Sequence, residues 1–406
     1  MDNKKPKLRF KGFTDDWEQR KVGEIIEDYI ERTTIQNQYP VLTSSQQQGI
    51  VLQEDYFADR QVTTNDNIGY YVLPYGCFTY RSRSDTDIFV FNRNNLINKG
   101  IISYYYPVFK TKNSNSNFLL RRLNFGIKRQ LSMAAEGTGQ KVLAHSKFKN
   151  MVVDIPKLDE QEKIGNLFEQ IDNLITLHQR KYDKLLNIKK SLLEKMFPKN
   201  GTNIPEIRFK GFTDAWEQRE LWEYTIWDKN FNEVEKIKQP KTIKYPYLLA
   251  DEFKRIEDST GDVQLLSTGQ YIGFTSKEKA GKYLCNGEVV TIPWGGVPNI
   301  KYFKGFFVTT DNRIATSSDI RILNNKYLYY LLNHNISFIE GIYRGASIKH
   351  PSMSDLLDMK IMLPNIDEQE RISKLLTKID NLITLHQRKY ETLKNIKQSL
   401  LEKMFI

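Results

Sequence analysis

Residues 158–198 read LDEQEKIGNLFEQIDNLITLHQRKYDKLLNIKKSLLEKMFP, and nearly the same stretch returns at the end of the chain. The second copy, IDEQERISKLLTKIDNLITLHQRKYETLKNIKQSLLEKMFI, occupies residues 366–406, and about 29 of the 41 positions are identical. From Ile164 to Met196, apolar residues recur at alternating steps of three and four, which is the spacing of a coiled-coil helix. Each copy therefore predicts one helix of about 38 residues, roughly 57 Å long, comparable to about 16 or 17 base pairs of DNA.

A second, shorter repeat lies upstream of each long one. It reads RFKGFTDDWEQR at residues 9–20 and RFKGFTDAWEQR at residues 208–219, with Asp16 replaced by Ala215. The chain thus alternates constant and variable segments, an order that internal repeats make visible before any local prediction. The first half also runs on from MFP into a second RFKGF, so the N-terminus reads as the continuation of the C-terminus. If a pseudo-twofold axis relates the halves, the two chain ends should lie close together.

The two variable segments, residues 21–155 and 220–363, differ in sequence but share a layout. Each has glycine turns, short aromatic or β-branched strands and one short helix, which predicts one fold with two different surfaces. Gly137 and Gly345 both stand 19 residues before a proline, so the repeat offset persists through this region. We expect an α+β protein in which two similar mixed α/β domains alternate with two long helices.

The apolar stripe of the long repeats is broader than a two-helix seam requires, which predicts a further helix packed there from a partner protein. His178 and His386 occupy seam positions. No carboxylate or cysteine repeats beside them at metal spacing, so we interpret them as polar groups that set the helix register or as packed core groups, not as metal ligands or bases.

The composition favours an anionic partner. The chain has 60 Lys plus Arg against 49 Asp plus Glu, a formal net charge of +11 and a pI near 9.2, which is compatible with nucleic acid but also with a merely basic protein. Two widely spaced cysteines indicate neither a disulfide framework nor a zinc site, and no segment resembles a signal peptide or a membrane helix. We therefore expect a cytoplasmic protein without a membrane partner.

Candidate DNA contacts are donors in loops at strand ends. Arginine suits guanine, and asparagine or glutamine suits adenine, whereas lysines more often bind phosphate and only position the protein. Any single one of these residues can equally be a solvated surface group. The candidates for base contact are Arg81, Arg83, Trp294 and Asn299, with the glycine-loop residues Gln140, Lys141, Arg344, Ser347 and Lys349. The candidates for phosphate contact are Lys110, Lys112, Lys277, Lys279 and Lys301.

The motifs Pro156-Lys-Leu-Asp-Glu-Gln-Glu-Lys-Ile and Leu192-Leu-Glu-Lys-Met-Phe, with their copies from Pro364 and Leu400, resemble the conserved regions of type I restriction-modification specificity subunits. The resemblance covers the whole chain. It implies two target-recognition domains that each read half of a split, asymmetric DNA sequence, and an antiparallel coiled coil that sets the unread spacer. The implied segments are residues 1–157 and 199–365, each holding a recognition domain, and the helices 158–198 and 366–406.

The same resemblance implies double-stranded DNA, two methyltransferase subunits docked on the helices and ATP-driven restriction subunits as partners. S-adenosylmethionine, ATP and Mg would belong to those partners, with no cofactor, metal or catalytic residue in this chain. Indeed, no Asn/Asp-Pro-Pro-Tyr/Phe element and no Gly-x4-Gly-Lys-Ser/Thr phosphate loop is found. Two alternatives remain: a coiled-coil adaptor without a DNA role, and a stand-alone DNA methyltransferase or nuclease.

Overall fold

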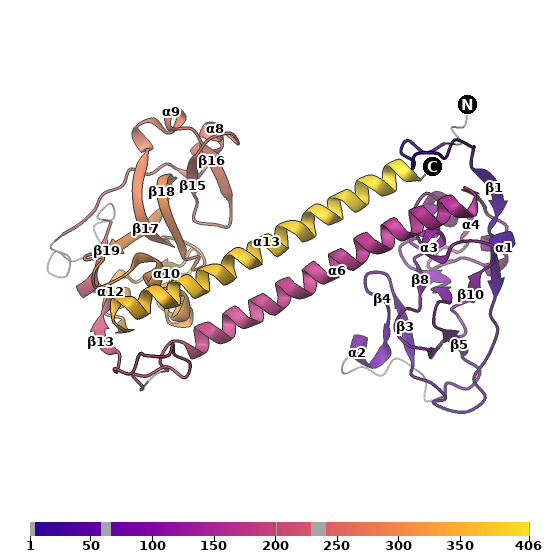
Figure 1. The fold of residues 1–406 in the computed structure, drawn as a ribbon, viewed down its shortest axis with the longest axis horizontal. Coiled ribbons are helices and arrows are strands. Elements are labelled where there is room, and N and C mark those ends of the chain that lie inside the picture. Colours follow the sequence, from indigo (N-terminus) through magenta and orange to yellow (C-terminus); the bar gives the residue numbers. More distant parts are fainter. Residues whose placement is uncertain (1–4, 58–65, 200, 229–240, 406) are drawn as a thin grey trace. The chain divides into compact units, whose positions relative to one another are not determined.

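The structure is a computed structural model that describes residues 5–57, 66–199, 201–228 and 241–405 (Figure 1). The chain forms two compact units. Unit 1 comprises Met1–Arg180 and His386–Ile406, and unit 2 comprises Lys181–Leu385. Each unit therefore contains one variable segment, the start of the long helix that follows it and the end of the other long helix.

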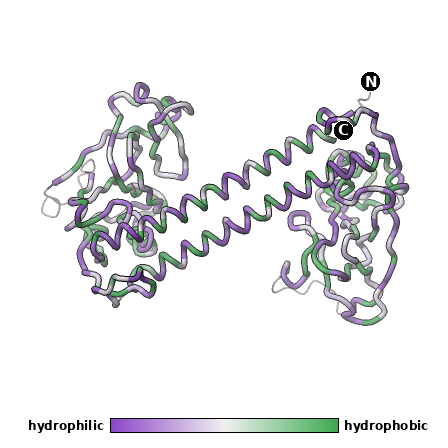
Figure 2. Tube along the Cα trace, in the orientation of Figure 1, coloured by the Kyte–Doolittle hydropathy of each residue, from purple (hydrophilic) through white to green (hydrophobic). Residues whose placement is uncertain are grey.

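The two long helices predicted from the repeats are α6 (Leu158–Lys195) and α13 (Ile366–Met404). Within unit 1 they run antiparallel, since Asp172 pairs with Lys397 at 2.6 Å and His178 faces His386 further along α6. Their Nδ1 atoms are 2.8 Å apart, so one imidazole donates and the other accepts, as expected for polar seam positions. Hydrophobic residues recur among hydrophilic ones along both helices (Figure 2).

Unit 1 contains several small antiparallel sheets and short helices. Among the described residues of this unit, the largest sheet has the strand order β2-β10-β6-β8, and separate two-stranded pairs are β1-β12, β3-β4, β5-β9 and β7-β11. The elements are β1 (Glu18–Lys21), α1 (Val22–Ile25), β2 (Ile26–Asp28), β3 (Leu42–Ser45), β4 (Gly49–Leu52), α2 (Gln53–Phe57), β5 (Tyr71–Pro74), β6 (Phe78–Tyr80), β7 (Arg83–Ser84), β8 (Phe91–Arg93), β9 (Lys99–Ile102), β10 (Val108–Thr111), α3 (Ser116–Asn124), α4 (Lys128–Ala134), β11 (Lys141–Val142), α5 (His145–Lys149) and β12 (Val152–Ile155).

Unit 2 repeats this plan around a longer sheet. Its six strands follow the order β14-β19-β17-β18-β15-β16, all antiparallel except β15 with β18, and β13-β22 and β20-β21 form separate pairs. The elements are β13 (Glu217–Glu220), α7 (Leu221–Tyr224), β14 (Thr225–Trp227), α8 (Ala250–Ile256), β15 (Val263–Leu266), β16 (Ile272–Thr275), α9 (Lys277–Ala280), a 3₁₀ turn (Gly281–Tyr283), β17 (Cys285–Pro293), β18 (Lys301–Thr309), β19 (Asn312–Ser317), α10 (Asn325–His334), α11 (Ile336–Gly341), β20 (Tyr343–Arg344), β21 (His350–Pro351), α12 (Met353–Leu357) and β22 (Lys360–Leu363).

A buried ion pair explains why the short and long repeats occur together. In unit 1, the Arg9 guanidinium donates to both carboxylate oxygens of Glu160, and in unit 2 Arg208 does the same with Glu368. The glutamate side chains are 2% and 1% exposed. Such planar, two-bond recognition of a carboxylate is specific to arginine. The pair attaches each RFKGF segment to the first turn of the long helix that follows in the chain.

The repeated Trp and Phe residues pack in the same way in both units. In unit 1, Phe405 contacts Trp17 edge to face and stacks on Phe118, with ring centroids 6.2 and 5.6 Å away. In unit 2, Phe197 contacts Trp216 and Tyr327 at 6.0 and 5.6 Å. The end of each long helix is therefore part of the hydrophobic core of the unit that it enters.

The conserved glutamine of each long helix holds the short helix of its unit. Gln161 accepts from the Asn115 backbone at 3.0 Å, and Gln369 accepts from the Asn324 backbone at 3.0 Å. Both asparagines are the N-caps of the predicted short helices, α3 and α10, and their side chains satisfy backbone donors of the first turn. One repeated polar network thus orients two helices of unrelated sequence.

The chain ends meet in unit 1, as predicted (Figure 1). The Leu8 N–H donates to the Lys403 carbonyl at 2.8 Å, and in unit 2 the Ile207 N–H donates to the Lys195 carbonyl at 2.9 Å. The two contacts occupy the same positions of the short and long repeats. The N-terminal segment therefore sits on the end of α13 just as the internal linker sits on the end of α6.

Candidate nucleic-acid interface

Both units build the same small hairpin beside the end of a strand. In unit 1, Glu136 pairs with Val142 around the turn that begins at Gly137. In unit 2, Arg344 pairs with His350 around the turn that begins at Gly345. The offset is 208 at every one of these positions, so the two turns, which share only their first glycine and the lysine at Lys141 and Lys349, are structurally equivalent.

The first glycine of each turn is required by its geometry. Gly137 and Gly345 have φ values of +127° and +144°, a region that side chains other than glycine rarely adopt. A Cβ at either position would also overlap a backbone carbonyl oxygen across the turn, that of Gln140 or Ile348. The glycines identified in the sequence therefore fix the shape of the turn.

Each hairpin pairs with a loop that leaves the central sheet. In unit 1 that loop follows β6, and Ser84 lies opposite Lys141. In unit 2 it follows β17, and the Gly296 N–H donates to the Lys349 carbonyl at 2.9 Å. We call the hairpin and its paired loop the recognition loops: residues 81–88 and 136–142 in unit 1, and residues 294–299 and 343–350 in unit 2.

Four predicted residues meet in the recognition loops of unit 1. Arg81 and Gln140 both approach Asp85, with Gln140 Nε2 donating at 2.9 Å and the Arg81 guanidinium 3.9 Å away. The Arg83 guanidinium lies 4.4 Å from the centre of the Tyr105 ring, which favours a cation–π contact. Lys141, which pairs with Ser84 through the backbone, is the fourth. Arg81 and Arg83 are both exposed.

A polar hollow of about 480 Å³ lies beside these side chains. Its walls include Arg81 and Arg83, the turn between β3 and β4 with Gln46 and Gln47, and Thr86. Amide, hydroxyl and guanidinium groups of this kind are the donors and acceptors that read base edges. The sequence interpretation missed Gln46, Gln47, Asp85 and Tyr105, because no repeat or motif marks them.

Five predicted residues lie in the recognition loops of unit 2, and four of them are at the hairpin and the start of its paired loop. Arg344, Ser347 and Lys349 are exposed on the hairpin, and Arg344 pairs with Asp355 at 2.6 Å. Trp294 is half-buried: the Arg313 guanidinium lies 3.4 Å from its ring centre, and His350 Nδ1 is 2.8 Å from its carbonyl oxygen. Trp294 therefore anchors the loop, while the hairpin presents the exposed donors.

Asn299 and Lys301 use their donors inside the chain. Asn299 Nδ2 donates to the Gly269 carbonyl at 2.8 Å, and Lys301 Nζ donates to the Ser267 carbonyl at 2.7 Å. Burial lowers the pKa of Lys301, as expected for an ammonium removed from water. The structure thus places both side chains as supports of the turn after β15.

The remaining predicted lysines lie away from the recognition loops. Lys277 packs on the Phe306 ring at 4.0 Å, near the start of β17, whereas the recognition loop leaves from its end. Lys279 pairs with Asp258 at 3.1 Å. Lys110 pairs with Glu27 at 3.3 Å, and Lys112 follows the end of β10 that points away from Arg81. All four are exposed, so contact with phosphate stays a prediction.

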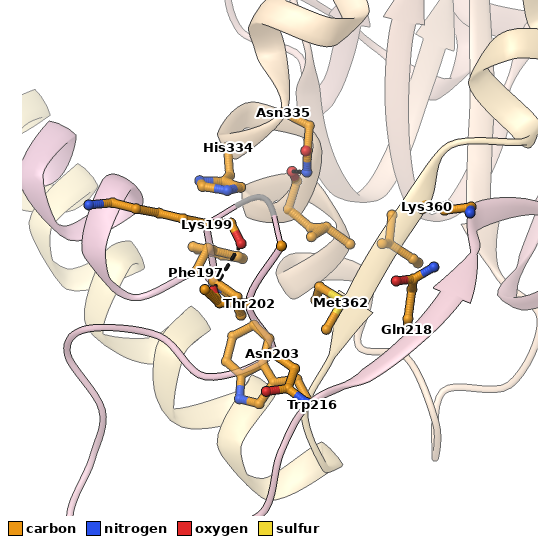
Figure 3. A pocket seen from close by; sticks show the side chains of 14 residues that line it. Phe197, Lys199, Thr202, Asn203, Trp216, Gln218, His334, Asn335, Lys360 and Met362 are labelled. Carbon is orange, nitrogen blue, oxygen red and sulfur yellow. Dashed lines mark hydrogen bonds between the residues drawn. The ribbon is translucent and has the colours of Figure 1, made fainter.

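Unit 2 also contains a hollow of about 570 Å³ around the linker that follows α6 (Figure 3). Lys199, Thr202 and Asn203 of the linker line it, facing His334 and Lys360. None of the candidate contact residues lines this hollow. It belongs to the frame that holds the linker, not to the recognition loops.

The chain matches the family model described as the type I restriction modification DNA specificity domain twice, over residues 14–187 and 230–395. The two matches cover most of the sequence. The chain belongs to the type I restriction-modification specificity family. It is a specificity subunit with DNA-recognition domains, and the recognition loops of both units lie within the matched ranges.

Two known members of the specificity family are similar over most of their length. The MjaVIII specificity subunit of a type I restriction enzyme from Methanocaldococcus jannaschii is 23% identical over 318 residues, 75% of this chain and 73% of that protein. The crystal structure of the type I restriction-modification S subunit from M. genitalium aligns over 99% of both chains with a TM-score of 0.67 and 13% identity. At that identity the structural likeness shows the fold alone.

The residues that the structure describes lack two kinds of feature. None of their helices is long and apolar enough to cross a membrane. They also contain no cluster of three or more His, Cys, Asp or Glu side chains arranged to hold a metal ion.

Proposed function

We propose that each set of recognition loops reads one half of a split, asymmetric DNA site. The observation that carries this proposal is the shared hairpin at the offset of 208, in which the backbone is repeated and most side chains differ, apart from the first glycine and Lys141/Lys349. Side chains at base edges determine sequence, whereas the backbone frame determines where they are held. Two unlike sets in equivalent frames favour two unlike half-sites.

Within this proposal, Arg81, Arg83, Gln140 and Lys141 read one half-site, and Arg344, Ser347 and Lys349 contribute to the other. Asn299, Lys301 and Trp294 support the loops. Lys110, Lys112, Lys277 and Lys279 bind phosphate further along the duplex, which adds affinity without sequence information.

We assign the two long helices a measuring and docking function. Their exposed apolar residues, such as Leu174, Leu177, Leu382 and Leu385, fit helices of two methyltransferase subunits, and restriction subunits would join through that complex. S-adenosylmethionine, ATP and Mg would be bound by those partners, and this chain would contribute no catalytic residue. Incubating the purified chain with DNA and S-adenosylmethionine should give no methylation, and methyl transfer by the chain alone would overturn this assignment.

Segment exchange tests the division of labour. Replacing residues 21–155 by the corresponding segment of another specificity subunit should change one half-site of the methylated sequence and leave the other intact, as read by methylation sequencing in cells. A change in both half-sites would contradict independent reading by the two units.

Heptad insertion tests the measuring function. Seven residues added to both α6 and α13 at matched positions lengthen each helix by roughly 10 Å, about three base pairs. The unread spacer should grow by that amount while both half-sites keep their sequence. An unchanged spacer would overturn the idea that the helices measure the site.

A further inference from the structure

The tips of the two sets of recognition loops are chemically opposite. In unit 1, the backbone of Ser84 pairs with that of Lys141, and the tip residues beyond this pair are Asp85 and Gln140. A 2.9 Å hydrogen bond joins the side chains of Asp85 and Gln140. In unit 2, Gly296 pairs with Lys349, so the equivalent tip residues are Val297 and Ile348. A polar pair in one unit is replaced by an aliphatic pair in the other.

Both members of the aliphatic pair are exposed at the loop tip. Val297 is 73% exposed and Ile348 is 60% exposed. Ile348 lies over Gly295, where a Cβ would come within 3.1 Å of Ile348 Cγ2. Removing aliphatic side chains from water is favourable, so an exposed aliphatic pair at a loop tip indicates a surface that is covered in a complex.

The surroundings of the pair identify what covers it. Arg344, Ser347 and Lys349 are exposed on the same hairpin, and such a mixture of cations and a hydroxyl suits the edge of a DNA groove. The major groove offers one apolar group, the 5-methyl of thymine. We propose that Val297 and Ile348 contact thymine methyl groups in the half-site read by unit 2, an inference that rests on the proposed function.

The other use of an exposed aliphatic tip is as a wedge between base pairs, which kinks the duplex from the minor groove. A wedge depends on stacking and not on the methyl group. Replacing thymine by deoxyuridine removes only the methyl and keeps base pairing, so it separates the two uses without changing the protein.

The test uses the full chain purified with its methyltransferase partner. The DNA duplexes carry the target sequence identified by methylation sequencing in cells. First, each thymine of the half-site read by unit 2 is replaced by deoxyuridine. We expect at least one replacement to weaken binding by on the order of three- to ten-fold. In the double variant Val297→Ser/Ile348→Ser, binding to the thymine duplex should fall by a similar factor, and the sensitivity to deoxyuridine should disappear.

Ile320→Ser is the matched control. Ile320 is 69% exposed but follows the end of β19 opposite to Asn312, which pairs beside the recognition loop. This variant should keep both the affinity and the deoxyuridine sensitivity of the unchanged protein.

The outcomes distinguish this inference from the proposed function. If the unchanged complex does not prefer its target to scrambled DNA, the proposed function itself fails. If it prefers its target but tolerates every deoxyuridine, the methyl contact is wrong. A double variant that binds weakly while deoxyuridine has no effect on the unchanged protein would reassign the pair to a wedge. Retained sensitivity in the double variant would place the methyl contact on other residues.

Discussion

The recognition loops of units 1 and 2 share one backbone arrangement but carry side chains of opposite character. In unit 1, Asp85 accepts from the Gln140 amide, and the Arg81 guanidinium approaches the same carboxylate. In unit 2, the positions of Asp85 and Gln140 are taken by Val297 and Ile348, and Trp294 packs on the Arg313 guanidinium. The features that the two units share are the backbone of the hairpin, the Arg–Glu ion pair and the packing at the ends of the long helices. A fold of this kind can change its target by loop substitution while its core is maintained.

The largest effect on stability is expected from variants that break the buried Arg–Glu pair of either unit. Glu160→Ala and Glu368→Ala each leave a largely buried arginine, Arg9 or Arg208, without its carboxylate. Removing one partner of a buried pair typically costs about 3–5 kcal/mol of unfolding free energy. Chemical denaturation of both variants should show similar losses, because the pair is the same in the two units.

Glu162→Ala is the control for this comparison, because Glu162 is exposed one turn or less from Glu160 on α6. It should change stability by well under about 1 kcal/mol. A loss in only one of the two buried variants would show that the frames are not energetically equivalent.

Much of the part that the two units share could be predicted from the sequence, because the chain carries two copies of the repeats. Repetition with constant spacing predicted the helices, their seam histidines, the meeting of the chain ends and the equivalence of Gly137 and Gly345. The Arg9–Glu160 contact was not predicted, since nothing in the sequence indicates which of many charges lie 151 positions apart yet touch. The repeats indicate which residues the two units share, but they do not indicate which of these residues contact one another.

The recognition side chains were only partly accessible, for a different reason. The sequence predicted several exposed loop donors, namely Arg81, Arg83, Gln140 and Arg344. It predicted Asn299 and Lys301 in the same way, because they are also polar donors at strand ends, yet their donors bind carbonyl groups of the chain. Whether a donor points to solvent or to a carbonyl such as that of Ser267 depends on loop geometry. The tip pair Val297 and Ile348 was missed because an exposed aliphatic residue carries no sequence signal of binding. Adding the offset of 208 to the position of Gln140, a predicted contact, points to Ile348, one of the two.

A smaller effect is expected at the glycines that shape the hairpins. Gly137→Ala and Gly345→Ala each place a Cβ at a strained positive φ and against a carbonyl oxygen, a cost of about 1–3 kcal/mol. Each should impair reading of one half-site, measured as binding to duplexes altered in one half at a time. Gly139→Ala, with open space around its Cβ position, should have little effect. If Gly137→Ala impairs both half-sites equally, the hairpins are not independent readers.

Single recognition residues should separate base contact from phosphate contact. Arg81→Ala should relax specificity at one base pair by about 1–3 kcal/mol, seen as similar binding of target and single-base variants. Lys277→Ala should weaken binding to all sequences alike and reduce the slope of log affinity against log salt by about one. A uniform loss with Arg81→Ala would reassign Arg81 to the DNA backbone.

The smallest effect on DNA binding is expected from Lys301→Met, although Lys301 was predicted beside Lys277 as a phosphate binder. Its ammonium already donates to the Ser267 carbonyl at 2.7 Å, and burial lowers its pKa. A cation that is occupied inside the protein releases no counterion from DNA. The salt dependence of binding should therefore remain that of the unchanged protein, whereas thermal stability falls because the turn after β15 loses its donor. A reduced salt slope in Lys301→Met would instead return this lysine to the DNA interface and extend the contact surface of unit 2 beyond its hairpin.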